Sequence, residues 1–190
     1  MIKIGITGSI ASGKTTACKI LSHNRGPLYS ADKIVKELYR DSNFKKLLVK
    51  VFNIKQKFNI KNSLKEKILL DSKNIKKLER LVHPIVRKKM KEFSNLHKKK
   101  NKVFYEIPLL VEKKLMYYFD VIIFIKAKKK VRLKRFKAKR GNEYLFNILN
   151  NKQFSDKEKI KYSDHVINNN QNLNILKKKI IKYNKIICMR

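Results

Sequence analysis

The chain has few of the residues that usually interrupt or crosslink a fold. Its 190 residues include five glycines, three prolines, two cysteines and no tryptophan. Cys18 and Cys188 stand far apart and form no CxxC pair, so neither a disulfide framework nor a zinc site is indicated. No apolar run approaches the ~18 residues of a membrane span. A glycine-rich turn arrives by Gly8, where a signal peptide would continue its apolar stretch. We therefore expect a cytoplasmic protein without a membrane anchor.

Acidic residues are also scarce. Fourteen Asp and Glu stand against 49 Lys and Arg, which gives a formal net charge of +35. Such an excess is typical of proteins that bind nucleic acid or an anionic surface. The bases are mostly lysine and are spread along the whole chain among many Ile and Asn. We therefore interpret the charge as compositional bias rather than a localised footprint, and expect no nucleic-acid partner.

The length suits a single domain, and a hydrophobic share of 43% is ordinary for a globular protein. Short apolar, β-branched runs predict five strands, at 2–7, 27–31, 102–107, 120–126 and 164–168. These runs are apolar on both faces and alternate with helical patterns, which favours a parallel sheet covered by helices. The helical patterns lie at 14–21, in an insertion at about 32–100, in a second insertion at about 128–162, and at 172–184. Within the first insertion, one helix is predicted to start beyond His83 and Pro84, with Val86, Met90, Phe93 and His97 at helical spacing.

Three of the five glycines lie within the first 13 residues, in "KIGITGSIASGKTT" (3–16). Gly8-x-x-x-x-Gly13-Lys14-Thr15 has the spacing of a P-loop, between a predicted strand and a predicted helix as that motif requires. Glycines let backbone N–H groups point inward, and the helix N-terminus adds positive potential for a phosphate. Lys14 is expected to reach the β- and γ-phosphates, and the Thr15 hydroxyl to hold Mg²⁺. The sequence thus predicts nucleotide phosphate binding, and ATP and Mg²⁺ as cofactors.

Asp32 follows the second predicted strand. In an open parallel sheet, the carboxyl ends of the strands face the ligand crevice. A carboxylate there could orient and deprotonate an attacking hydroxyl. Asp32 could also serve as the N-cap of the helix that follows, and the two roles are compatible.

Further motifs occur in order along nearly the whole chain. They are "SAD" (30–32), "LVHPIVR" (81–87), "IPLLVE" (107–112), "RLKRFKAKR" (132–140), Gln153 and "HVINNN" (165–170). Together with the P-loop, they resemble the dephospho-CoA kinase family, whose members catalyse the last step of coenzyme A synthesis. "HP" followed by "PLL-x-E" is distinctive of this family among small P-loop kinases.

The resemblance implies a P-loop α/β three-layer sandwich that transfers the γ-phosphoryl group of Mg-ATP to the ribose 3′-hydroxyl of dephospho-CoA. The nucleotide-binding core would comprise 1–31, 101–127 and 163–190, the helical substrate domain 32–100, and the lid 128–162. Residues expected at the nucleotide are Gly8, Ala11, Ser12, Gly13, Lys14, Thr15, Thr16 and Arg135. The expected catalytic residues are Lys14, Asp32 and Arg140. Residues expected at dephospho-CoA are His83, Pro84, Arg87, Leu110 and Glu112. His83 and Glu112 also have structural alternatives, a place at a helix start and a helix cap respectively.

This sequence departs from the family pattern in four places. Ser30 replaces the first aspartate of the usual "DAD". Ala11 stands where glycine is usual, which is tolerable if its φ is negative. Glu106 stands where many relatives have aspartate, so a longer carboxylate would have to meet the Mg²⁺ water. The spacing from Arg135 to Arg140 is one residue longer than usual, and Lys139 occupies the expected register. Either Lys139 or Arg140 could therefore reach the phosphates.

The sequence thus predicts a monomeric small-molecule kinase that acts on dephospho-CoA. The basic segment 126–140 holds ten Lys or Arg and no acid, and would supply cations to the transferred charge. A different small-molecule kinase, such as a nucleoside monophosphate kinase, stays an alternative. A P-loop nucleic-acid-binding protein is the more distant one.

Overall fold

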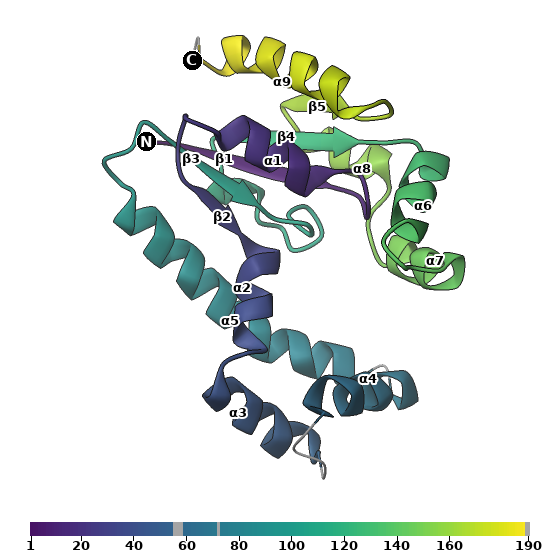
Figure 1. The fold of residues 1–190 in the computed structure, drawn as a ribbon. Helices are drawn as coiled ribbons and strands as arrows, with labels where there is room; N and C mark the ends of the chain where they lie inside the picture. Colours follow the sequence, from purple (N-terminus) through teal and green to yellow (C-terminus); the bar gives the residue numbers. More distant parts are fainter. Residues whose placement is uncertain (55–58, 72, 189–190) are drawn as a thin grey trace. The chain divides into compact units, whose positions relative to one another are not determined.

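The computed structural model describes residues 1–54, 59–71 and 73–188 (Figure 1). These residues fall into two compact units. We call residues 1–30 together with the chain from His97 onward the core unit, and residues 31–96 the helical unit. Each unit is described by itself below.

The core unit is built on one parallel sheet. Its strands are β1 (Ile2–Gly8), β2 (Leu28–Ser30), β3 (Lys102–Glu106), β4 (Val121–Lys126) and β5 (His165–Asn168). They lie in the order β2-β3-β1-β4-β5, and every neighbouring pair is parallel. The five predicted strands and the parallel α/β fold class are therefore confirmed. The order places the end of β1 in the middle of the sheet, between the ends of β3 and β4.

Helices α1 (Lys14–Ser22) and α9 (Leu173–Cys188) pack against one another and cover one face of this sheet (Figure 1). The apolar core under them contains Ile4 and Ile6 of β1, Cys18 of α1 and Ile180 of α9. Side chains alternate along a strand, and the alternate positions Tyr105, Ile122 and Phe124 are also buried, on the other face. Because side chains on both faces are buried, the central positions of β3 and β4 are apolar on both faces.

Three further helices follow β4 in the core unit. They are α6 (Lys129–Lys137), α7 (Glu143–Asn151) and α8 (Asp156–Lys161), and a 3₁₀ turn, η2 (Met116–Tyr118), precedes β4. Phe136 of α6 and Phe146 of α7 pack with ring centroids 5.7 Å apart. This contact joins α6 and α7, two of the three helices of the predicted lid segment.

The helical unit contains α2 (Ala31–Leu38), α3 (Ser42–Phe52), α4 (Ile60–Leu70) and α5 (Lys73–Leu96). Their apolar sides meet in one cluster of buried side chains, formed by Phe44, Leu48, Phe52, Ile54, Leu64 and Val82. An Asp41 side chain accepts a hydrogen bond from the Phe44 N–H and caps α3. The described residues of this unit form no strand, in agreement with the sequence pattern.

The predicted start of one helix was wrong. α5 begins at Lys73 and runs through Pro84, whereas the proline had indicated a start beyond position 84. A proline inside a helix removes one backbone hydrogen bond and usually kinks or ends it. Here Leu78, Leu81 and Ile85 lie on both sides of Pro84 and pack against the apolar cluster. That burial on both sides of the proline offsets the lost hydrogen bond.

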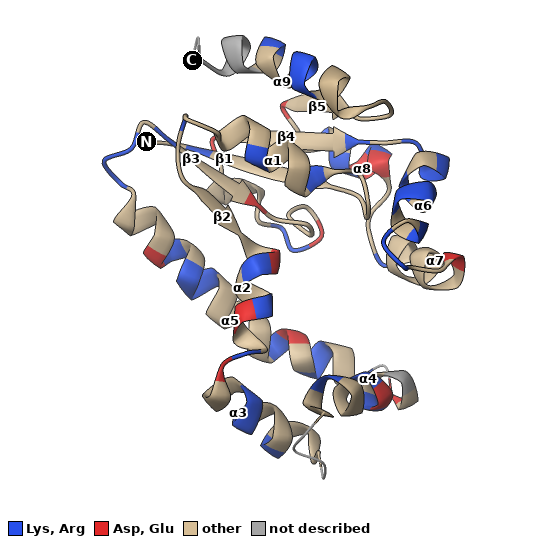
Figure 2. Ribbon diagram, viewed as in Figure 1, with Lys and Arg blue, Asp and Glu red and all other residues tan. Residues whose placement is uncertain are grey.

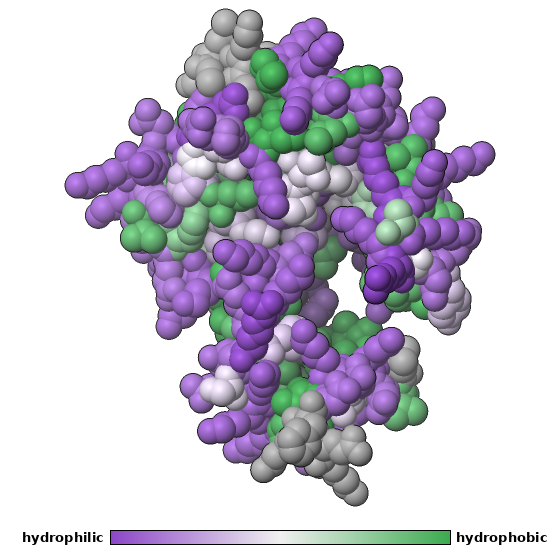
Figure 3. Space-filling view, in the orientation of Figure 1, coloured by the Kyte–Doolittle hydropathy of each residue, from purple (hydrophilic) through white to green (hydrophobic). Residues whose placement is uncertain are grey.

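Within the described ranges, no helix combines the length and the low polarity that crossing a membrane demands. Figure 3 shows a face dominated by hydrophilic side chains, with apolar side chains in separate patches.

Candidate active site

The P-loop connects β1 to α1 at the centre of the sheet. Gly13 stands at the N-cap of α1 with φ 89°, in the left-handed region that favours glycine. Gly8 is required for a different reason, because a Cβ there would lie 2.6 Å from the Ser12 Oγ and 2.8 Å from the Ile125 carbonyl oxygen. No side chain caps α1, so its first N–H groups stay available to an anion. The Ser12 hydroxyl is buried without a hydrogen-bond partner among the described residues, beside these N–H groups.

Ala11 has φ 56°, so the condition named for tolerating alanine here, a negative φ, is not met. The turn of the P-loop requires the left-handed conformation here, which a residue with a Cβ adopts at a cost of about 1 kcal/mol. This explains why glycine is usual at this position. The surrounding loop holds the strained backbone in place, with Ser12 N–H donating to the Ser9 carbonyl at 3.0 Å.

Glu106, the last residue of β3, contacts several polar side chains near the start of α1. Its side chain is only 2% exposed, and its Oε1 accepts the Thr15 hydroxyl at 2.5 Å. The Lys14 Nζ lies 3.6 Å from the same oxygen. Its other oxygen, Oε2, accepts the Ser30 hydroxyl at 2.8 Å. Ser30 and Glu106, two of the departures from the family pattern, are thus bonded to each other, and the longer carboxylate reaches Ser30 and Thr15 at once.

The Thr15 hydroxyl and the Glu106 carboxylate fit a magnesium ion. Mg²⁺ prefers oxygen ligands and is usually held by one or two carboxylates, waters and substrate phosphates. The described residues contain no cluster of three His, Cys, Asp or Glu that would make a metal cage by itself. One hydroxyl and one carboxylate are what a shared protein–phosphate magnesium site needs from the protein.

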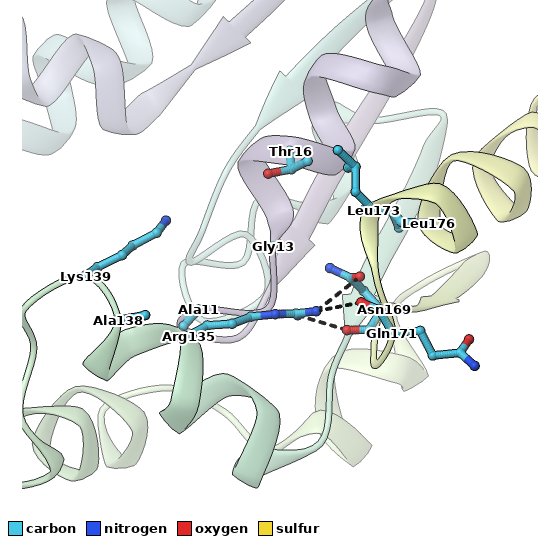
Figure 4. A pocket seen from close by; sticks show the side chains of 10 residues that line it. All are labelled: Ala11, Gly13, Thr16, Arg135, Ala138, Lys139, Asn169, Gln171, Leu173 and Leu176. Carbon is cyan, nitrogen blue, oxygen red and sulfur yellow. Dashed lines mark hydrogen bonds between the residues drawn. The ribbon is translucent and has the colours of Figure 1, made fainter.

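A pocket of about 340 Å³ adjoins the P-loop within the core unit (Figure 4). The P-loop, the end of α6 and the segment from β5 to α9 surround it. Its lining residues are Ala11, Gly13, Thr16, Arg135, Ala138, Lys139, Asn169, Gln171, Leu173 and Leu176. Apolar side chains thus lie beside a guanidinium and two amides, a combination that suits an aromatic base with polar edges.

Arg135 forms one wall of this pocket. Its guanidinium donates to the Ser12 carbonyl at 3.3 Å, to the Asn169 carbonyl at 2.9 Å and to the Gln171 carbonyl at 3.2 Å. Burial lowers the pKa of Arg135 from its ordinary value, yet an arginine stays charged in proteins. Arg135 therefore places a fixed positive charge against the P-loop.

The sequence left open whether Lys139 or Arg140 reaches the phosphates, and the two residues lie differently with respect to the pocket. Lys139 lines it, projecting from the end of α6 away from Arg135 in Figure 4. Arg140 is exposed with φ 63° and is not among the lining residues. Lys139, which occupies the position expected from the family pattern, is thus the residue at the pocket. A catalytic role for Arg140 stays a prediction.

Residues of α6, of α8 and of the segment that leads into α8 bond to Ser9 and Ile10 at the start of the P-loop. The Ile10 N–H donates to Gln153 Oε1 at 2.8 Å, and the Ser9 hydroxyl donates to Asp156 Oδ1 at 2.7 Å. Arg132, buried in α6, donates to Asn150 Oδ1 at 2.8 Å and to the Ile10 carbonyl at 3.4 Å. The predicted lid segment is thus bonded to the first residues of the P-loop.

The loop after β3, which carries "PLL-x-E", is tied to the sheet. The Thr7 hydroxyl donates to the Pro108 carbonyl at 3.1 Å. Leu110 is fully buried, and a Cβ on Gly5 would lie 2.8 Å from its Cδ1. The side chain of Leu110 therefore packs into the core unit, and its contact with substrate stays a prediction. Glu112 Oε1 lies 2.8 Å from the ammonium of Lys159 and accepts the Phe154 N–H at 3.1 Å. Neither oxygen caps a helix, and the substrate contact of Glu112 stays a prediction.

The remaining predicted residues belong to the helical unit. Asp32 is exposed in the first turn of α2, which starts at Ala31, so it is not the N-cap. A carboxylate in a first helical turn is stabilised by the helix dipole. His83 and Arg87 are four residues apart and share one face of α5, and Pro84 is exposed beside them. His83 lies in the middle of α5, so its place at a helix start was wrong.

Several residues at this site were absent from the predicted set, although the sequence contained a signal for some of them. Asn169 follows β5 directly and donates to the Ser12 carbonyl at 2.8 Å. It stands just beyond the carboxyl end of a strand, where parallel sheets bind ligands. Glu106 at the end of β3 has the same kind of position, and it had been considered beside Mg²⁺ without being included in the predicted set. Asp156 and Lys159 lie in a short polar helix with no such signal.

Positive charge is not confined to this site. Figure 2 shows Lys and Arg on helices of both units, including α1, α5, α6 and α9. This distribution fits the interpretation of compositional bias.

Comparison with known proteins identifies the family. The family model described as "Dephospho-CoA kinase" matches residues 2–174. A dephospho-CoA kinase of Bartonella quintana is 35% identical over 175 residues, which cover 90% of each chain. A crystal structure from Thermus thermophilus has a TM-score of 0.81 at 27% identity, covering 96% of this chain and 95% of that one. The dephospho-CoA kinase from Campylobacter jejuni has a TM-score of 0.69 at 26% identity, covering 97% and 96%. The chain belongs to the dephospho-CoA kinase family.

Proposed function

We propose that this chain transfers the γ-phosphoryl group of ATP to the ribose 3′-hydroxyl of dephospho-CoA and releases CoA and ADP. The observation that carries this proposal is the group of Lys14, Thr15 and Glu106 at the uncapped start of α1, in a chain of this family. Free helical N–H groups, an ammonium and a hydroxyl paired with a carboxylate are the parts that phosphoryl transfer requires.

The nucleotide would occupy the P-loop and the adjoining pocket. The phosphates would lie on the N–H groups at the start of α1, with the Ser12 hydroxyl as a further donor. The base would enter the pocket between Arg135 and the apolar side chains of Leu173 and Leu176. A planar guanidinium stacks well on an aromatic ring.

Magnesium would be held by Thr15 and Glu106 together with phosphate oxygens. When bound, the ion offsets negative charge on the β- and γ-phosphates. Lys14 would add a second positive charge at the same phosphates after leaving its contact with Glu106. The Ser30 hydroxyl keeps the Glu106 carboxylate oriented toward the P-loop.

The reaction itself forms one bond and breaks one. The acceptor oxygen attacks the γ-phosphorus while the bond to the β–γ bridging oxygen breaks, and ADP leaves with that electron pair. We assign to Asp32 the acceptance of the hydroxyl proton. Its chain position supports this, because Asp32 follows Ser30 by two residues and Ser30 is fixed on Glu106.

Dephospho-CoA would also meet residues of the helical unit. We assign its recognition to the face of α5 that carries His83 and Arg87, since an arginine can pair with acceptor phosphates through two hydrogen bonds. The monomeric state and the cytoplasmic location stay predictions.

An acceptor panel tests the proposal. ADP release from Mg-ATP is measured with dephospho-CoA, AMP, CMP and shikimate, each at the same concentration. Release stimulated only by dephospho-CoA, with CoA as product, is the expected result. Stimulation by AMP or CMP instead would assign the P-loop to a nucleoside monophosphate kinase and overturn the proposal.

A further inference from the structure

Lys159 is a fully buried lysine in a short helix beside the P-loop. α8 has only six residues, Asp156–Lys161, and its sequence, DKEKIK, is almost wholly polar. The side chain of Lys159 is 0% exposed and that of Glu112 is 8% exposed. Their Nζ and Oε1 atoms lie 2.8 Å apart. A lysine is almost never buried completely unless it is paired. The contact with Glu112 accounts for the burial, and the question is what a buried charged pair does at this place.

The two ends of the segment 153–159 are bonded to different parts of the site. At one end, Gln153 accepts the Ile10 N–H and Asp156 accepts the Ser9 hydroxyl, both at the start of the P-loop. At the other end, Lys159 contacts Glu112 in the loop after β3. The same carboxylate also accepts the N–H of Phe154, the residue next to Gln153. The segment therefore links the P-loop to the loop that carries "PLL-x-E".

Stability alone is a poor explanation for the pair of Lys159 and Glu112. Burying an ion pair often costs as much free energy as the attraction returns, and apolar residues of similar size frequently do as well or better. The Glu112 Oε2 atom is buried without a hydrogen-bond partner among the described residues, which adds to the cost. Burial also lowers the pKa of Lys159, an effect that the neighbouring Glu112 carboxylate opposes. What such a pair does provide is one defined position for α8.

We propose that Lys159 is a positioning residue for phosphoryl transfer. Its contact with Glu112 fixes the segment 153–159, and through Gln153 and Asp156 this segment fixes Ser9 and Ile10 at the start of the P-loop. The proposal rests on the proposed kinase function for its kinetic part only.

The expected effect falls on turnover more than on ATP affinity. Several N–H groups at the start of α1 would hold the phosphates, so a small displacement of the loop should change ATP binding little. In-line transfer is far more sensitive, because a misplacement of about 1 Å can cost about 10²-fold in rate. Lys159→Met keeps a similar volume and removes the charge.

The first experiment compares Lys159→Met with Lys157→Met, an exposed lysine of the same helix. In Lys159→Met, kcat is expected to fall about 10- to 100-fold while KM for ATP stays within about threefold. Lys157→Met should match the wild type in both. A Lys159→Met enzyme that melts at a lower temperature but keeps the wild-type kcat would show a structural role alone and overturn the proposal.

A second readout is independent of the reaction. Amide hydrogen exchange of the peptide containing Ser9 and Ile10 should be faster in Lys159→Met than in Lys157→Met, because the Ile10 N–H loses its fixed partner. Unchanged exchange there would contradict the proposed link. A wild type that fails to phosphorylate dephospho-CoA would instead refute the proposed function and leave this exchange difference in place.

A double variant separates position from stability. Lys159→Met removes the partner of a buried carboxylate and is expected to destabilise the fold, whereas Lys159→Met combined with Glu112→Gln leaves no unpaired charge. The double variant should recover thermal stability without recovering kcat, which is measured at saturating dephospho-CoA and compared with that of Glu112→Gln alone, because Glu112 is itself a predicted substrate contact. Recovery of both would overturn the proposal. If the single variant does not fold, the double variant provides the kinetic test.

Discussion

The interactions inside the core unit differ in kind from those inside the helical unit. In the core unit, buried polar side chains join residues far apart along the chain. Thr15 and Glu106 are 91 positions apart, Ser9 and Asp156 are 147 apart, and Asn169 and Ser12 are 157 apart. These bonds converge on the P-loop from three separate segments.

The helical unit depends on an apolar cluster and on local polar contacts. Phe44, Leu48 and Phe52 of α3 are buried members of this cluster. The Asp41 side chain caps the helix three residues ahead of Phe44, and the Asn74 side chain donates to the Lys67 carbonyl seven positions away. Polar contacts of this kind end helices but do not build a site.

The difference shows what each unit has to achieve. A phosphate site needs several polar groups fixed to within fractions of an ångström, and bonds from distant segments hold them there. A helical unit that presents a surface needs only stable packing, which tolerates many apolar sequences. Substitutions in the core unit should therefore damage turnover, and substitutions in the cluster should damage stability.

The largest effect is expected for Lys14→Met in the P-loop. Loss of the ammonium next to the transferred charge should lower kcat/KM roughly 10³-fold without unfolding the chain. Steady-state kinetics with Mg-ATP and dephospho-CoA measure this, and circular dichroism checks the fold. Lys19→Met, an exposed change on the same helix, is the control. A Lys14→Met enzyme within about tenfold of wild type would remove Lys14 from the mechanism.

Leu48→Ala tests the apolar cluster. Leu48 is 0% exposed, so its truncation should lower the free energy of unfolding by about 2–5 kcal/mol. Its neighbour Leu47 is 38% exposed, and Leu47→Ala should cost less than about 1 kcal/mol. Denaturant titration measures both. The folded Leu48→Ala protein should keep its affinity for ATP. A large loss of that affinity would contradict the claim that the apolar cluster affects stability alone.

Asp32→Asn sharpens the comparison, because it places a functional residue in the helical unit. Without a proton acceptor, kcat should fall by at least about 10²-fold while ATP still binds. Glu37→Gln, on the exposed side of the same helix, should have little effect. Stopped-flow or steady-state turnover together with an ATP-binding titration decides the matter, and an unchanged kcat would exclude Asp32 as the base.

The smallest effect is a pH dependence from Lys159. Burial lowers the pKa of Lys159 from its ordinary 10.5, although Glu112 and Asp156 act in the opposite direction and Lys14 in the same one. In the window between that lowered pKa and 10.5, the unfolded chain binds more protons at this lysine than the folded chain. The free energy of unfolding should therefore rise with pH there, by at most about 1.4 kcal/mol per pH unit.

The comparison for this test is the double variant Lys159→Met and Glu112→Gln, which lacks the titrating lysine. The difference in unfolding free energy between wild type and double variant should grow in favour of the wild type as pH rises. Over the same window kcat of the wild type should fall, because the ammonium of Lys159 is lost. A wild type whose stability falls relative to the double variant would contradict the lowered pKa.

The sequence predicted those parts of the fold that depend on local pattern. The β-branched runs identified all five strands, and the spacing from Gly8 to Thr15 identified the P-loop. At two positions, tertiary packing overrides what the local sequence indicated. The helix α5 continues through Pro84 because apolar side chains on both sides of it are buried, and Ala11 adopts a positive φ because the loop requires it.

The partners of the site could not be predicted in the same way. Nothing near Lys159 in the sequence indicates that Glu112, 47 positions earlier, lies beside it. Ser30 and Glu106 each looked like an isolated departure from the family pattern until the fold brought them together. Such pairs depend on which strands are neighbours, and that information is not contained in either local segment.

The most direct test of the proposed reaction is a product assay. The purified chain is incubated with Mg-ATP and dephospho-CoA, ADP is quantified, and the second product is compared with authentic CoA by chromatography and by the ³¹P resonance of its 3′-phosphate. We predict one ADP for each CoA formed, and formation of both products roughly 10³-fold slower with Lys14→Met. ADP released without CoA, or no ADP at all from the folded wild type, would contradict the proposed function.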